Sequence, residues 1–92
     1  MTKDELDSFF GKHGDEYLKG DIEGPRDLAA FNLLHKLVPS KKDIIAASEH
    51  DEFWLSVDRE AVAEVATEED VIFLIRCGVM LDDFDTGFSM FS

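Results

Sequence analysis

Apolar residues recur every three or four positions in the first forty residues, a spacing typical of amphipathic helices. A first helix is predicted from the capping box at residues 2–5 to the glycines at 11 and 14. A second helix begins at Gly24-Pro25 and ends before Pro39, because proline suits a helix start and disfavours helical geometry in the preceding residue. The second helix has an apolar stripe of Leu28, Phe31, Leu34 and Leu37, with Ala30 and Val38 beside them.

The period of the pattern changes from Asp43 onward. Residues 44–49 alternate along the chain, and residues 53–57 alternate again after the polar turn His50-Asp51. This alternation predicts a β-hairpin. A short helix from Ser40 is the alternative, because the segment that begins there also has the spacing of a capping box.

Two short helices are predicted after this hairpin. Asp58 suits an N-cap before an apolar face at residues 61–66. Residues 67–70 form a capping box before the apolar run 71–75, and Gly78 is expected to end that helix in the left-handed conformation.

The end of the chain predicts a second hairpin. Residues 79–81 and 88–91 are its strands, and the turn between them contains Gly87, which is expected to supply a positive φ. The predicted fold is therefore α+β, with N-terminal helices, two short helices and a small antiparallel sheet built from two β-hairpins. We expect the helices to pack on one face of that sheet.

Nearly all of the negative charge lies in the second half of the chain. Residues 43–92 hold thirteen carboxylates against Arg59 and Arg76, whereas the first 42 residues hold eight acids and seven bases. Apolar runs accompany the acids, so this half is expected to be folded rather than to form an acidic tail. A net charge of −12 opposes direct binding to nucleic acid or to an anionic membrane, and it favours a basic partner.

Length and composition predict a single domain over residues 1–92, since 45% apolar content is enough for one core. The apolar segments are too short to span a bilayer and the N-terminus lacks the pattern of a secretion signal, so the expected location is the cytoplasm. Cys77 is alone, which excludes an internal disulfide and a multi-cysteine zinc site. We expect it to be reduced and buried near a helix end.

No residues have the spacing of a catalytic, cofactor-binding or metal site, so we expect a protein that is not an enzyme and holds no cofactor or metal. The acids at 82–85 fail the spacing of a calcium loop and are interpreted as turn residues. The carboxylates at 68–70 are interpreted as first-turn residues that the helix dipole favours. None of the three histidines is spaced as a zinc ligand or a triad member.

Trp54 is an apolar residue whose direction matters for function. If Phe53, Leu55 and Val57 face the core, the pleat turns Trp54 to the other side of the sheet. An aromatic side chain among acids resembles a hot spot with a charged rim, while the alternative is that Trp54 covers the far side of the sheet or packs under a helix. Phe73 raises the same question, because its helix is apolar on nearly every side and suits deep burial or a homodimer seam.

The segments 51–58 (DEFWLSVD), 67–70 (TEED) and 75–79 (IRCGV) resemble, in style, the small acidic accessory proteins encoded by phages and mobile elements. The likeness covers roughly the last 45 residues and includes no active-site motif. Members of that group, anti-CRISPR and anti-restriction proteins included, often bind and block a host machine, and some imitate the charge of DNA. The resemblance implies an inhibitor of this kind.

The leading hypothesis is a non-enzymatic acidic protein whose second half docks on a basic, nucleic-acid-binding surface of a larger protein and inhibits or modulates it. The alternative is a small homodimeric structural or assembly module whose charge serves solubility. The residues expected to bind the partner surround the first hairpin and the helix after it: Glu49, Asp51, Glu52, Trp54, Asp58, Glu60 and Glu64.

Overall fold

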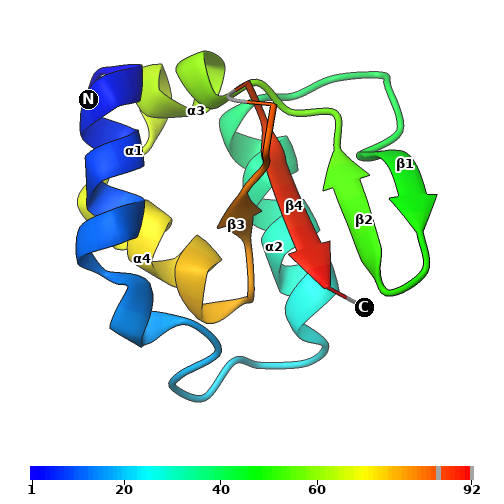
Figure 1. The fold of residues 1–92 in the computed structure, drawn as a ribbon, viewed down its shortest axis with the longest axis horizontal. Coiled ribbons are helices and arrows are strands. Elements are labelled where there is room, and N and C mark those ends of the chain that lie inside the picture. Colours follow the sequence, from blue (N-terminus) through cyan, green and yellow to red (C-terminus); the bar gives the residue numbers. More distant parts are fainter. Residues whose placement is uncertain (85, 92) are drawn as a thin grey trace.

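The computed structural model describes residues 1–84 and 86–91, and within them it shows four α-helices, a short 3-10 helix and a four-stranded sheet (Figure 1). The predicted α+β class is confirmed. In chain order the elements are α1 (Lys3–Lys12), the 3-10 helix η1 (Gly14–Glu16), α2 (Arg26–Leu37), β1 (Ile45–Glu49), β2 (Glu52–Leu55), α3 (Arg59–Val65), α4 (Glu68–Arg76), β3 (Met80–Leu81) and β4 (Phe88–Phe91).

Side chains cap three of the helices where the sequence predicts them. At the start of α1, the Thr2 hydroxyl accepts a hydrogen bond from the Glu5 amide, and the Glu5 carboxylate accepts one from the Thr2 amide. Thr67 and Asp70 form the same reciprocal box at the start of α4. The Asp58 carboxylate caps α3. These contacts satisfy backbone donors that have no partner inside the helix.

The buried face of α2 differs from the predicted stripe. Ala30 and Leu34 are buried, but Leu28 is 53% exposed. Leu28 lies about 200° around the helix from Ala30, because each residue turns an α-helix by about 100°. The start of α2 also differs slightly, since Pro25 is the N-cap residue and Arg26 is the first helical one. The predicted end of α4 is confirmed, with Gly78 at a φ of +95°.

The sheet is antiparallel throughout and has the strand order β1-β2-β4-β3. Both predicted hairpins are present, and the pairing of β2 with β4 joins them into one sheet. The alternative helix from Ser40 is wrong, because residues 45–49 form a strand. That strand carries a bulge between Ile45 and Ala47 and lies at one edge of the sheet.

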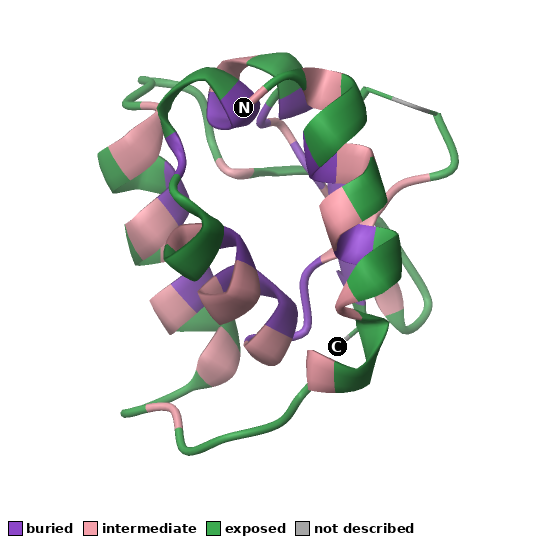
Figure 2. Ribbon diagram, turned by 90° about the vertical axis from the view of Figure 1, so that its left-hand side faces the viewer, coloured by how far each residue is buried: buried purple, intermediate pink, exposed green. Residues whose placement is uncertain are grey.

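The helices cover one face of the sheet. In Figure 1, α2 crosses behind the strands, and α1 and α4 lie beside β3. The ring of Phe31 on α2 lies 6.0 Å from Phe53, and the ring of Phe10 on α1 lies 5.8 Å from Phe88. The long connection between η1 and α2, at the bottom of the molecule, is mostly exposed (Figure 2). The buried apolar residues of the two central strands face the helices: Phe53, Leu55, Phe88 and Met90.

The connection between β3 and β4 corrects the prediction for Gly87. This residue does not have a positive φ; it is buried, and a Cβ atom there would lie 3.0 Å from the carboxylate of Asp82 and 3.3 Å from the carbonyl oxygen of Val57. Glycine suits this position because neighbouring groups approach closely, and not because the backbone adopts a positive φ. The predicted turn acid Asp85 lies outside the described residues.

Candidate binding face of the sheet

The pleat of β2 places Trp54 on the side of the sheet away from the helices. Phe53, Leu55 and Val57 are all buried, as the alternation predicts, while Trp54 between them is half-buried. No helix lies in front of this side of the sheet in Figure 1. The predicted direction of Trp54 is therefore confirmed.

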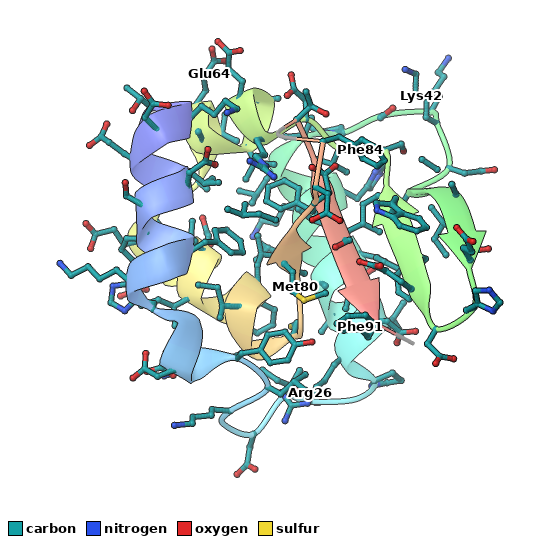
Figure 3. The ribbon with its side chains drawn as sticks, viewed as in Figure 1. Arg26, Lys42, Glu64, Met80, Phe84 and Phe91 are labelled. Carbon is teal, nitrogen blue, oxygen red and sulfur yellow. The ribbon has the colours of Figure 1, made fainter. Side chains whose placement is uncertain are left out.

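Strand pairing gathers further residues on the same side, because residues directly opposite each other share a face of a sheet. One row contains Glu49, Glu52 and Phe91, and the next contains Ala47, Trp54, Ser89 and Met80. Met80 and Phe91 lie toward the lower end of this side (Figure 3). We call these seven residues the open face: Ala47, Glu49, Glu52, Trp54, Met80, Ser89 and Phe91.

The centre of the open face is apolar. Ser89 is only 2% exposed, because it lies between the larger side chains of Trp54 and Met80. Trp54 thus partly fulfils the alternative reading of the sequence, in which it covers the far side of the sheet. Phe91 is 58% exposed, so its ring offers apolar area to a partner without any rearrangement.

The lower edge of the open face is acidic. Glu49 and Glu52 are direct partners across the β1–β2 pair, and Asp51 lies in the turn that joins them. Within the described part of the chain, no Lys or Arg side chain forms an ion pair with these three carboxylates. Like charges directly opposite each other destabilise an antiparallel pair, on the order of 0.2–1 kcal/mol. The sheet therefore holds two carboxylates where they repel each other.

Both basic residues of the second half of the chain are used inside the molecule. Arg59 is buried, and its guanidinium pairs with Asp7 at 3.4 Å and with Asp82 at 3.1 Å. Arg76 Nε lies 3.0 Å from the carboxylate of Glu16. Neither arginine is therefore placed to neutralise the acids of the open face.

The structure divides the predicted partner-binding residues into two groups. Glu49, Asp51, Glu52 and Trp54 meet at the open face and its turn, but the other three belong to the start and outer side of α3. Six steps of extended chain lead from Glu52 to Asp58, roughly 20 Å at about 3.3 Å per residue, and four steps lead from Trp54 to Asp58, roughly 13 Å. Glu64 lies at the top of the molecule in Figure 3, whereas the turn between β1 and β2 lies at the lower right in the same view (Figure 1).

Two residues of the α3 group stabilise the start of that helix. Asp58 accepts a hydrogen bond from the amide of Glu60 at 3.2 Å, and Glu60 lies in the first turn of the helix, where the dipole favours a carboxylate. Glu64 is exposed. Met80 and Phe91 were not predicted as site residues, because their side of the sheet depends on which strands pair.

The arrangement of the open face suits binding. Among the described residues, no three His, Cys, Asp or Glu side chains are grouped to hold a metal ion. Cys77 is not part of the open face: it is buried at the end of α4, as predicted. Burial raises the pKa of its thiol, and the positive charge of Arg26 opposes that shift. What the open face presents is apolar area with carboxylates at its rim.

No protein-family model matches the chain, and no curated protein or solved structure matches it. None of the described helices has both the length and the apolar character needed to cross a bilayer.

Proposed function

We propose that this protein is a non-enzymatic acidic binding protein of the cytoplasm, which docks its open face on a basic surface of a larger, nucleic-acid-binding protein and inhibits or modulates it. The observation that carries the proposal is the Glu49–Glu52 pair beside the exposed ring of Phe91. Two carboxylates are held opposite each other next to uncovered apolar area.

A basic partner relieves the repulsion within this pair. A Lys or Arg side chain placed between Glu49 and Glu52 would form charge-assisted hydrogen bonds, which are stronger than neutral ones. Trp54 and Phe91 would supply the apolar contact that typically dominates binding energy, and the surrounding acids would orient the partner and speed association. The open face thus combines an apolar centre with a charged rim.

The charge of the whole protein favours a surface that otherwise binds nucleic acid. Such surfaces carry clustered Lys and Arg side chains that contact phosphates. This chain has a net charge of −12, and Arg59 and Arg76, the two arginines of its second half, form ion pairs within the molecule. Its charge therefore complements a basic surface of that kind. A protein bound there would compete with DNA or RNA, which is how it would inhibit.

Capture of partners with matched variants tests the proposal. The double substitution Glu49→Gln/Glu52→Gln removes two charges from the open face, and Glu60→Gln/Glu64→Gln removes two from α3. We expect the immobilised wild-type protein and the α3 variant to retain the same nucleic-acid-binding protein from a lysate of the source cell, and the open-face variant to lose it. Equal loss with both variants would show that only the net charge matters.

A homodimer that buries the open face is the second candidate function, as a structural or assembly module. The ring of Phe91, which is 58% exposed on the open face, favours it, while the exposed ring of Phe84 lies outside that face. Light scattering over a range of concentrations distinguishes the two. A stable dimer that the Phe91→Ser substitution dissociates, and the Phe84→Ser substitution leaves intact, would support the module and leave little open face for a basic partner.

A further inference from the structure

A groove separates α2 from α4 on a different part of the molecule. It has a volume of about 640 Å³ and is lined by Ala29, Asn32 and Leu33 of α2, by three residues of α4, and by Glu23 of the preceding connection. Positions 29, 32 and 33 share one side of a helix, and so do 69, 70 and 73. The two helices therefore present one continuous side each to the groove.

The floor of the groove is apolar. Ala29, Leu33 and Phe73 contribute it, and all three are half-buried. A second hollow of about 410 Å³ adjoins on the other side of Phe73 and adds Ile22 and Ile72. The apolar run 71–75 is therefore shared between two surfaces: α4 buries one side of it in the core and exposes part of the other side to the groove.

The rim of the groove is acidic. Glu23, Glu69 and Asp70 line the first hollow, and Asp21 lines the second. No described Lys or Arg forms an ion pair with any of these four carboxylates. Arg76 also borders the second hollow, but its guanidinium is paired with Glu16.

This charge selects between possible occupants. In a symmetric dimer, the same surface of both copies meets, so each acidic rim would face another acidic rim. Like charges brought together in this way oppose binding. A basic occupant instead pairs with the rim and covers the apolar floor.

We infer that the groove between α2 and α4 binds a short basic amphipathic helix of another protein. The apolar side of that helix would lie on Leu33 and Phe73, and its Lys or Arg side chains would reach Glu23 and Glu69. Helices that lay an apolar face into a groove are a common recognition mode. This surface is separate from the open face, and the inference does not depend on the proposed function.

The test uses a fluorescent peptide of about 14 residues, long enough to span α2 at about 1.5 Å per residue, built from Leu and Lys at helical spacing. A counterpart with Glu in place of Lys is the charge control. Anisotropy gives the affinity, and amide NMR shifts of the full chain locate the contact. We expect the Lys peptide to shift amides around Leu33 and Phe73, and the Glu peptide to shift none.

Adjacent residues of α4 provide a matched pair of variants. Glu68 and Glu69 are both exposed in the first turn, but Glu68 faces α1 and Glu69 faces the groove. Glu69→Lys should weaken the peptide about tenfold, as loss of a close charge pair does, and Glu68→Lys much less. Glu23→Lys, outside any helix, serves the same purpose if Glu69→Lys unfolds the protein.

Three results would overturn the inference. They are the absence of peptide binding, equal weakening by Glu68→Lys and Glu69→Lys, and amide shifts centred on the β1–β2 turn. Glu49→Gln/Glu52→Gln should leave peptide binding unchanged, so failure here is distinguishable from failure of the open face to bind its partner.

Discussion

Arg59 donates hydrogen bonds to both the backbone and the side chain of Asp82. Its Nη2 atom lies 2.8 Å from the backbone oxygen of Asp82 and 3.1 Å from the carboxylate. Its Nε atom donates to the carbonyl oxygen of Gly87 at 2.8 Å. One buried side chain at the start of α3 thus fixes both ends of the β3–β4 connection. Because β4 pairs with β2, this contact also positions the strands of the open face.

Removal of this guanidinium should destabilise the fold strongly. Arg59→Met leaves the Asp82 carboxylate buried without its partner, and breaking a buried pair costs about 3–5 kcal/mol. Arg76→Met removes an ion pair whose side chains are 42% and 29% exposed, and it should cost less than about 1 kcal/mol. Urea unfolding of both variants gives the two free energies. Similar losses would contradict a special role for Arg59.

Two glycine substitutions should change stability in opposite directions. At Gly87 an added methyl group meets the Asp82 carboxylate and the Val57 carbonyl oxygen, so Gly87→Ala should lose about 1–3 kcal/mol through overpacking. At Gly11, within α1, nothing lies within 4 Å of the added methyl group. Gly11→Ala should therefore gain about 0.5–1 kcal/mol by reducing the freedom of the unfolded chain. Thermal unfolding measures both, and a tolerated Gly87→Ala would show that the close approach is absent.

The repulsion between Glu49 and Glu52 should be visible in the free protein. Glu52→Gln removes it and should raise the free energy of unfolding by about 0.2–1 kcal/mol, with a smaller gain at high salt. Glu60→Gln removes the same charge from the first turn of α3 and should lower the free energy by about 0.3–1 kcal/mol. Trp54 fluorescence during urea unfolding reports both. A stability loss with Glu52→Gln would mean that its carboxylate has a structural role.

Cys77 should lower the free energy of unfolding at alkaline pH. Burial raises the pKa of its thiol in the folded state, so the unfolded chain releases this proton first. The thiol's contribution is fully present below the unfolded pKa of about 8.5 and is lost as pH rises through the higher folded value. We expect the free energy of unfolding to fall more steeply above that pH in the wild type than in Cys77→Ala. Parallel pH profiles would contradict this.

Local signals in the sequence predicted much of the fold. The capping boxes that begin at Thr2 and Thr67, and the left-handed Gly78, each depend on residues within a few positions of one another. The buried position of Arg59 and the close approach at Gly87 depend on elements far apart in the sequence, and neither was predictable from spacing.

In the candidate site too, local patterns predicted some features, while others depend on elements far apart in the sequence. Alternation within β2 predicted the direction of Trp54, because Trp54 and its buried neighbours Phe53 and Leu55 lie in the same strand. The pairing of β2 with β4 brings Phe91 beside Glu52, and no local pattern states which hairpins join. The acids of α3 were grouped with those of the hairpin because they are close in sequence, but an extended strand separates them.

Competition with duplex DNA tests the proposed docking most directly. The affinity of the protein for its captured partner is measured at about 50 and 200 mM salt, with and without excess duplex, because contacts that replace phosphate binding are strongly salt-dependent. We predict that affinity falls at least tenfold over this range, that duplex DNA displaces the protein, and that Glu49→Gln/Glu52→Gln weakens the complex. Binding that is insensitive to salt and unaffected by DNA would contradict the docking of the open face on a nucleic-acid-binding surface.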